Sequence, residues 1–155
     1  MQLYRAISER LADPSMRARL KSFFTQDSTV PQLLEWVHAR LRFTKEGILR
    51  HNDPFKIIEY GRGMCREFSV LFTAACLANG YRARIILDLS DHAWTEVWNA
   101  EERRWVHVDP SEKRIDDPEM YERDWKKNLR SVYAFENGVM EEVTSTYKMK
   151  RSTRP

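Results

Sequence analysis

The chain has 155 residues, of which 42% are hydrophobic and 32% are charged. This length allows one domain with a substantial core and excludes two domains of ordinary size, and the composition is typical of a soluble globular protein. The formal net charge of +3 would become −1 without the four basic side chains of residues 148–155, so the charge does not indicate a nucleic-acid partner.

The sequence shows neither a secretory signal nor a membrane-spanning segment. Charged residues interrupt positions 1–20 every few residues, so no signal peptide is expected there. The longest apolar run, at 70–78, is far shorter than the roughly 20 residues that a membrane span needs. Cys65 and Cys76 fall on one predicted helix, roughly 16 Å apart by helical rise, which is too far for a disulfide. We therefore expect two free thiols and a cytoplasmic chain.

The first third of the chain has apolar residues at helical spacing. In the first predicted helix, Leu3, Ile7 and Leu11 share one face. Three more helices are predicted from proline-containing starts, namely one from Pro14 to Phe24, one after Ser28 with Pro31 in its first turn, and a short one from Asp53-Pro54 to Ile58.

Residues 64–79 are apolar on nearly all sides, which predicts a buried central helix rather than an amphipathic surface helix. Gly80 is placed to end that helix. Alternating apolar residues then predict a strand over 81–89, with Tyr81, Ala83, Ile85, Leu87 and Leu89 on one face.

Further strands are expected at 92–99, 104–109, 132–137 and 139–147, with a hairpin at Asn137-Gly138 between the last two. Helices followed by consecutive antiparallel strands define an α+β fold. We predict a single domain over residues 1–147 and a basic, disordered tail over residues 148–155.

Three residues form the main functional pattern of the chain. Cys65 begins the central helix, His92 follows 27 residues later, and Asp109 follows 17 residues after that. A helix N-terminus favours the thiolate form of a cysteine. An imidazole can take the thiol proton, and a carboxylate can fix the tautomer of the imidazole. The pattern therefore predicts a cysteine nucleophile with a histidine and an aspartate beside it.

The predicted strand register brings two of these residues together. If residues 100–103 form a four-residue loop, Asn99 pairs with Arg104. His92 and Asp109 then share a face and are diagonal neighbours, about 7–8 Å apart at Cα and within side-chain reach. A bulge or an odd loop length would break this arrangement.

Cys65, His92 and Asp109 each also have a purely structural interpretation, and so does the second cysteine of the chain. Cys76 is interpreted as a packing residue, whereas Cys65 follows a glycine turn beside two arginines and is interpreted as the nucleophile. Taken alone, His92 is equally consistent with a turn histidine, and Asp109 is better explained as a strand end before Pro110. The prediction therefore depends on the three together.

Other residues carry weaker signals. Trp94, His107 and Glu67 are candidates for contacts with the substrate, although His107 is equally consistent with a partly exposed strand residue. Trp98 is predicted to pack against the helices. The sequence has no Cys-x-x-Cys pair or matching histidine pair for zinc and no phosphate-binding glycine loop, so no metal and no cofactor are expected.

The chain resembles the transglutaminase-like superfamily, and within it the catalytic core of peptide:N-glycanases. The strings that carry the superfamily resemblance are Cys65-Arg-Glu-Phe, Gly80-Tyr-Arg-Ala-Arg, Asp91-His-Ala-Trp-Thr-Glu-Val and Trp105-Val-His-Val-Asp. Those that carry the glycanase resemblance are Leu33-Leu-Glu-Trp, Tyr121-Glu-Arg-Asp-Trp-Lys-Lys, Tyr133-Ala-Phe and Val143-Thr-Ser-Thr-Tyr.

The resemblance implies Cys65 as nucleophile, His92 as general base and acid, and Asp109 as the orienting carboxylate of an amidase. It also implies a protein, peptide or glycopeptide substrate. The paired zinc cysteines of eukaryotic glycanases have no counterpart between Trp36 and Cys65, so we expect zinc-independent activity. Two alternatives are a cysteine peptidase and a non-catalytic binding module on the same fold.

Overall fold

The computed structural model describes residues 1–150, with most helices in the first half of the chain and the long strands in the second. The helices are α1 (Gln2–Leu11), α2 (Pro14–Lys21), α3 (Val30–Arg40), α4 (Pro54–Tyr60), α5 (Cys65–Ala78), α6 (Met120–Arg123) and α7 (Thr144–Tyr147). The strands are β1 (Arg42–Phe43), β2 (Arg62–Gly63), β3 (Ala83–Asp88), β4 (His92–Asn99), β5 (Arg104–Asp109), β6 (Arg114–Ile115), β7 (Val132–Glu136) and β8 (Val139–Glu142). Within residues 1–150, no helix has the length and apolar character needed to cross a membrane.

The predicted helices of the first third are confirmed, and three of them begin with a local cap. Asp13 accepts a hydrogen bond from the first turn of α2, and Asp53 accepts one from the first turn of α4. Thr29 and Gln32 form a reciprocal capping box at the start of α3. A proline in the first turn of each helix lacks the N–H that would otherwise need a partner there.

The main sheet confirms the predicted α+β class. Its strand order is β6-β5-β4-β3-β7-β8, and all neighbouring pairs are antiparallel. In the pair β4–β5, Asn99 lies opposite Arg104 and Thr95 lies opposite Val108. This is the register predicted from a four-residue hairpin loop.

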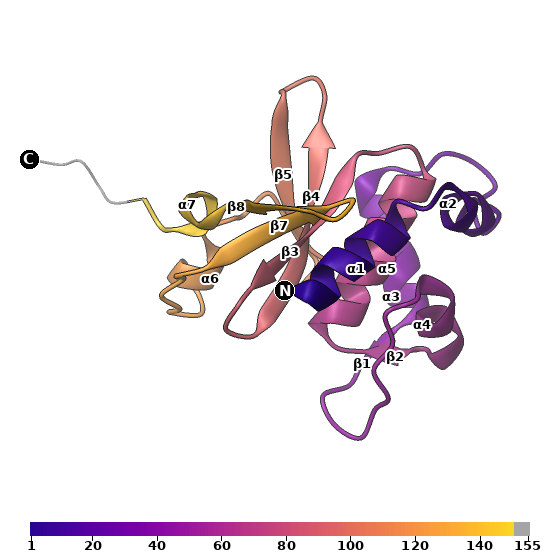
Figure 1. Ribbon diagram of the computed structural model, residues 1–155, viewed down its shortest axis with the longest axis horizontal. Coiled ribbons are helices and arrows are strands. Elements are labelled where there is room, and N and C mark those ends of the chain that lie inside the picture. The colour runs from indigo at the N-terminus through magenta and orange to yellow at the C-terminus, as the bar shows by residue number, and fades with distance from the viewer. Residues whose placement is uncertain (151–155) are drawn as a thin grey trace, which may run out of the picture.

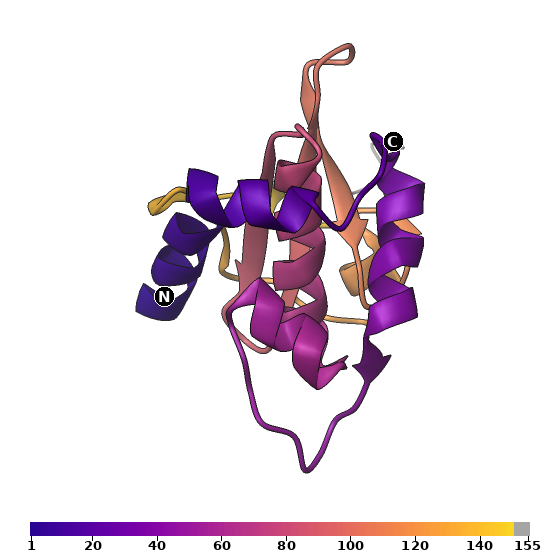
Figure 2. The same ribbon diagram turned by 90° about the vertical axis from the view of Figure 1, so that its right-hand side faces the viewer.

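The two faces of the sheet are covered differently, as Figures 1 and 2 show. Helix α5 packs against one face, where the hydroxyls of Thr73 and Thr95 lie 2.9 Å apart. The core on this side includes most of α5 and side chains from α1, α2 and α3. Helices α6 and α7 lie on the other side, where a second core contains Ile86, Trp94, Met120, Tyr121, Leu129, Val132, Ala134, Val143 and Tyr147.

The predicted location of Trp98 is wrong. Because Thr95 points toward α5, the even-numbered residues of β4 point to the opposite face of the sheet. Trp98 therefore lies away from α5, partly exposed, and its ring is 5.4 Å from that of Trp105. Trp94 lies on the same face but is fully buried in the second core.

The predicted strand over 139–147 is only half right. Strand β8 ends at Glu142, and residues 144–147 form the short helix α7. Val143 and Tyr147, four residues apart, both enter the second core, a spacing that suits a helical turn and not a strand. The predicted second helix also ends earlier than expected, at Lys21.

The predicted tail begins too early. The Lys148 ammonium donates to the Glu122 carboxylate at 2.7 Å and to the Leu129 carbonyl at 3.0 Å. The backbone N–H of Met149 donates to the other oxygen of Glu122 at 2.7 Å. Residues 148–150 are therefore held against α6. The rest of the predicted tail, residues 151–155, lies outside the described residues.

A tight contact before α5 fixes where that helix begins. Strand β1 pairs in parallel with β2, and Gly63 of β2 lies against Glu67. The Glu67 carboxylate accepts a hydrogen bond from the backbone N–H of Met64 at 2.8 Å and another from Arg50 at 2.8 Å. A Cβ atom on residue 63 would lie 2.3 Å from Cβ of Glu67, so only glycine leaves room for this cap.

Replacement Gly63→Ala should therefore destabilise the protein by about 1–3 kcal/mol, because overpacking moves Glu67 off the start of α5. It should also change the rate at which Cys65 reacts with iodoacetamide. Urea unfolding and alkylation kinetics measure the two effects.

The matched control is Gly47→Ala, where an added Cβ meets nothing within 4 Å and the cost is confined to the positive φ of +67°. Equal stability of wild type and Gly63→Ala would contradict the packing argument.

Candidate active site

Cys65 is the first residue of α5, at the edge of the core and partly exposed. The first backbone N–H groups of a helix have no carbonyl partner within it, and their dipoles favour a negative charge. Cys76 lies three turns further along α5 and is fully buried. Burial raises the pKa of the Cys76 thiol far above its usual range. Both cysteines are free, as predicted.

His92 and Asp109 are hydrogen-bonded, as the predicted register requires. Nε2 of His92 lies 2.9 Å from Oδ2 of Asp109. The Cys65 side chain contributes, together with Asp109, to the raised pKa of the same imidazole. Because Nε2 of His92 faces Asp109, Nδ1 is the ring nitrogen that remains for a second partner. The predicted contact of His92 with Asp109 is thus present, and the participation of Cys65 stays a prediction.

The carboxylate of Asp109 is fully buried and receives four hydrogen bonds. Oδ2 accepts from His92 and from the Tyr121 hydroxyl at 2.7 Å. Oδ1 accepts from the Ser111 hydroxyl at 3.0 Å and from the backbone N–H of Glu112 at 3.1 Å. A buried charge is tolerated when its lone pairs are satisfied in this way.

The electrostatics of the site favour a charged pair. Burial disfavours the imidazolium form of His92, but hydrogen bonds with Asp109 and Cys65 outweigh it and raise the pKa of His92 to about 9. Burial also disfavours the carboxylate of Asp109, yet the hydrogen bond from His92 holds its pKa below the usual range. Both shifts describe an imidazolium–carboxylate pair at neutral pH.

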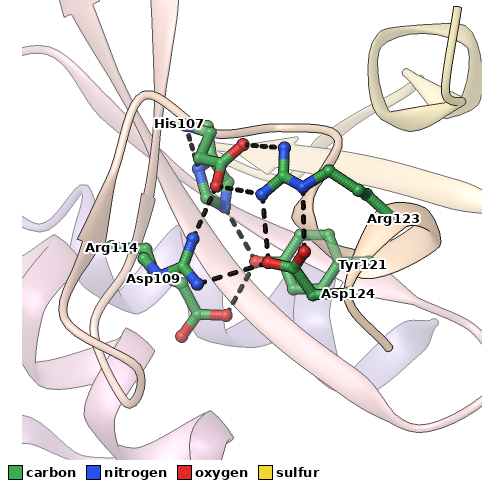
Figure 3. A network of polar contacts seen from close by, with 7 residues as sticks. His107, Asp109, Arg114, Tyr121, Arg123 and Asp124 are labelled. Atoms are coloured by element: carbon green, nitrogen blue, oxygen red, sulfur yellow. Dashed lines mark hydrogen bonds and ion pairs between the residues drawn. The ribbon is translucent and has the colours of Figure 1, made fainter. Parts of the chain in front are cut away.

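The three weaker candidates from the sequence are all buried. Glu67 is 1% exposed and caps α5, while Trp94 is 0% exposed and stacks on Tyr121 at a centroid distance of 4.2 Å. His107 is 3% exposed and is linked to Asp109 through the hydroxyl of Tyr121 (Figure 3). None of them offers a surface to a substrate, so the prediction of substrate contact is corrected to support of the site from within.

Two residues that the site argument missed lie next to it. Tyr121 of α6 binds Asp109 from the second core (Figure 3). Trp125 follows α6, and its ring lies 4.9 Å from that of His92 in an edge-to-face arrangement, with 37% of its surface exposed. The only sequence signal for either was that both belong to the string 121–127, which carried the glycanase resemblance.

The segment that carries Trp125 is anchored by one ammonium group. Lys127 donates to Asp88, the last residue of β3, at 2.8 Å and to Asp91, in the loop that leads into β4, at 2.5 Å. This bridge ties the segment after α6 to the strand that carries His92. An exposed aromatic ring is therefore held beside the reactive groups.

The described part of the chain contains no group of three or more His, Cys, Asp or Glu side chains arranged to hold a metal ion. The residues of the site suit nucleophilic chemistry instead: a thiol at a helix start, an imidazole and a buried carboxylate.

Comparisons with known proteins define the family. Residues 16–110 match the transglutaminase-like superfamily, and residues 89–154 match the Rad4 transglutaminase-like domain. The chain therefore belongs to the transglutaminase-like superfamily, which confirms the resemblance found in its motifs.

Its curated relatives include enzymes named peptide-N(4)-(N-acetyl-beta-glucosaminyl)asparagine amidase. The protein from Gallus gallus is 44% identical over 101 residues, and that from Arabidopsis thaliana is 41% identical over 101 residues. The match covers 65% of this chain in both cases. It covers 16% and 14% of these two relatives, so the chain spans about a sixth of their length.

Solved structures with a similar fold include Rad4-Rad23 bound to a 6-4 photoproduct UV lesion. The TM-score is 0.70 at 16% identity, over 95% of this chain and 46% of that chain. The periplasmic domain of TgpA from Pseudomonas aeruginosa has a TM-score of 0.50 at 21% identity, over 83% of this chain and 53% of that one. These similarities establish the fold alone. One of the Rad4-Rad23 structures is crosslinked to an undamaged DNA, and the absence of a nucleic-acid partner for this chain stays a prediction.

The pair of His92 and Asp109 should make stability depend on pH. The pKa of His92 is raised from 6.5 to about 9 in the folded protein, so its stabilising effect is fully present below pH 6.5 and is lost as pH rises through 9. Wild type should lose up to about 3 kcal/mol relative to His92→Gln across this range.

Urea unfolding of both proteins at pH 6 and pH 9.5 measures this difference. A gap between wild type and His92→Gln that is the same at both pH values would show that folding does not raise the pKa of His92.

Proposed function

We propose that this chain is the catalytic core of a cysteine amidase in which Cys65 is the nucleophile, His92 the general acid and base, and Asp109 the orienting carboxylate. The observation that carries the proposal is the 2.9 Å hydrogen bond between His92 and Asp109, next to a cysteine that begins a buried helix. The membership of the chain in the transglutaminase-like superfamily supports it.

In the first half of the reaction, the thiolate of Cys65 attacks the carbonyl carbon of a carboxamide. The tetrahedral intermediate collapses as the imidazolium of His92 gives its proton to the departing amine nitrogen, which leaves a thioester on Cys65. In the second half, His92 takes a proton from water as the water oxygen attacks the thioester. The products are a carboxylic acid, the amine and the free thiol.

The negative oxygen of the intermediate needs a donor close to the attacked carbon. The backbone N–H of Cys65 belongs to the first turn of α5 and has no carbonyl partner within the helix. It is therefore the donor we assign to the oxyanion, assisted by the helix dipole.

The substrate that we favour is an asparagine side chain that carries N-acetylglucosamine, in a peptide or unfolded protein. The support is the name of the relatives, which are 40–44% identical over their matched regions. An exposed aromatic ring beside the reacting groups also suits a sugar ring, because Trp125 presents an apolar face to solvent next to His92. We further propose that the protein acts in the cytoplasm, where free thiols persist.

A non-catalytic binding module is the second candidate. The fold likeness to DNA-bound Rad4 covers 95% of this chain, and residues 89–154 match the Rad4 domain family. A binding module has no need of a charged histidine beside a reactive thiol, so thiol reactivity distinguishes the two candidates.

Incubation with a denatured glycoprotein should convert its glycosylated asparagine to aspartate with loss of the glycan, as detected by mass spectrometry. Cys65→Ala should abolish this conversion and leave the fold intact. The matched control Cys76→Ala should retain the activity at a cost on the order of 1 kcal/mol in stability, because Cys76 is a fully buried packing residue.

Iodoacetamide should label Cys65 and spare Cys76 in the folded protein. If Cys76→Ala removes activity and Cys65→Ala does not, the nucleophile is misassigned. Absence of conversion in wild type, combined with tight binding of duplex DNA, would favour the binding module.

Zinc independence leads to a separate prediction. EDTA should change neither the thermal midpoint nor the turnover, since the described residues form no group of metal ligands and the segment between β1 and α4 is tied down by hydrogen bonds of Leu49 with Tyr60 and of Arg50 with Glu67. Loss of either property on chelation, followed by recovery with added zinc, would contradict the metal-free proposal.

A further inference from the structure

A series of buried hydrogen bonds continues from Asp109 through Tyr121 to His107 (Figure 3). The Tyr121 hydroxyl donates to Oδ2 of Asp109 at 2.7 Å. Nε2 of His107 lies 2.8 Å from that hydroxyl oxygen. The backbone N–H of Asp117 donates to Nδ1 of His107 at 3.1 Å. His107 and Tyr121 are 3% and 0% exposed, so water does not compete for these contacts.

The donor and acceptor capacity of each group fixes the position of every hydrogen in this series of hydrogen bonds. The backbone N–H of Asp117 can only donate, so Nδ1 of His107 accepts. A neutral imidazole then carries its hydrogen on Nε2 and donates it to the oxygen of Tyr121. Tyr121 has a single hydroxyl hydrogen, which is left for Asp109. The two donors to Oδ2 of Asp109 are thus His92 and Tyr121.

The surroundings keep His107 neutral. Burial lowers its pKa to about 4, and the nearby carboxylates of Asp109, Asp117 and Asp116 do not offset this effect. The positive charge of His92 lowers it further. A protonated His107 would also oppose two N–H groups at Nδ1, so the geometry and the charge distribution agree.

The hydrogen-bond series ends near the surface at Asp117, whose side chain is held by two arginines. The Asp117 carboxylate accepts hydrogen bonds from Arg123 at 2.6 and 2.9 Å and from Arg114 at 2.6 Å. Arg123 belongs to α6, the helix that also carries Tyr121. This exposed network holds the Asp117 backbone against His107 (Figure 3).

We propose that His107 and Tyr121 are positioning residues of the candidate active site. The His107 imidazole holds and polarises the Tyr121 hydroxyl, and this hydroxyl shares one carboxylate oxygen of Asp109 with His92. The catalytic meaning of this inference rests on the proposed function. A donor to an anion withdraws part of its negative charge, so Tyr121 limits how strongly Asp109 stabilises the imidazolium form of His92. The reaction needs that limit, because this imidazolium gives its Nδ1 proton to the leaving amine while its Nε2 proton stays in the hydrogen bond with Asp109.

The test is the titration of the His92 ring, followed by NMR in protein labelled with ¹⁵N-histidine, with His92→Gln to assign the signal. In Tyr121→Phe the ring stacking on Trp94 is kept and only the hydroxyl is lost. The titration midpoint of His92 should then rise by about half a unit to one unit, because Asp109 keeps more of its charge for His92. A loss of structure at the site would have the opposite sign and would move the midpoint toward 6.5.

Tyr147→Phe is the matched control. Tyr147 is as buried as Tyr121 and packs on the same Trp94 ring at 4.8 Å, but its hydroxyl donates to Glu96. It should lower stability and leave the midpoint of His92 unchanged. His107→Leu removes the donor to Tyr121 and should give a smaller rise, whereas His107→Gln keeps an N–H donor and should restore the wild-type midpoint.

An unchanged or lowered midpoint in folded Tyr121→Phe would overturn the inference, as would an equal rise in Tyr147→Phe. If Tyr121→Phe does not fold, the comparison of His107→Leu with His107→Gln decides the question in the same way. The titration requires no substrate, so it is independent of amidase activity. With the glycoprotein substrate, Tyr121→Phe should lower kcat several-fold with little change in KM, whereas failure of wild type to act on that substrate would count against the proposed function alone.

Discussion

The buried carboxylate of Asp109 is the group on which the arrangement of the second half of the chain depends. An ionised group without solvent costs several kcal/mol unless hydrogen bonds replace its water. Its donors come from β4, from α6 and from the turn that follows β5. These elements are separated in the sequence, so the need to satisfy one carboxylate determines how they meet. A residue that looks like an ordinary strand end therefore organises the site.

The two faces of the sheet contribute differently to the same site. On one face, α5 is packed on nearly all sides and presents Cys65 at its first turn. On the other, an aromatic cluster of Trp94, Tyr121 and Tyr147 lies beneath His92 and leaves little freedom to its ring. Cys65 and His92 come from two different layers, helix α5 and the sheet. Core packing on both faces thus sets the geometry of the reactive groups.

The family comparisons show that some functional conclusions follow from the fold, whereas others depend on the residues of the site. The same fold supports amidases and a DNA-bound repair protein, so the fold does not choose between catalysis and binding. The choice depends on whether the thiol, the imidazole and the carboxylate act together. The charged pair of His92 and Asp109 is the feature of this chain that favours catalysis.

The sequence by itself determined the features that depend on local periodicity. The helix starts at Pro14 and Pro54, the buried helix from Cys65 and the register that pairs Asn99 with Arg104 follow from caps, apolar spacing and loop length. The parity of side chains in that register was enough to place His92 beside Asp109, because alternation along a strand is a local property.

Only the tertiary structure decided which groups surround these residues. Tyr121 lies on a four-residue helix with no recognisable pattern. Trp98 faces away from α5, because the sequence does not say which face of the sheet that helix covers. His107 alternates like an exposed strand residue, yet α6 and the turn at Asp117 bury it. In the sequence Lys148 begins a basic tail, but in the structure its ammonium group donates a hydrogen bond to Glu122. Contacts between distant segments cannot be predicted from the spacing of residues along the sequence, because they form only when those segments pack together in the second core.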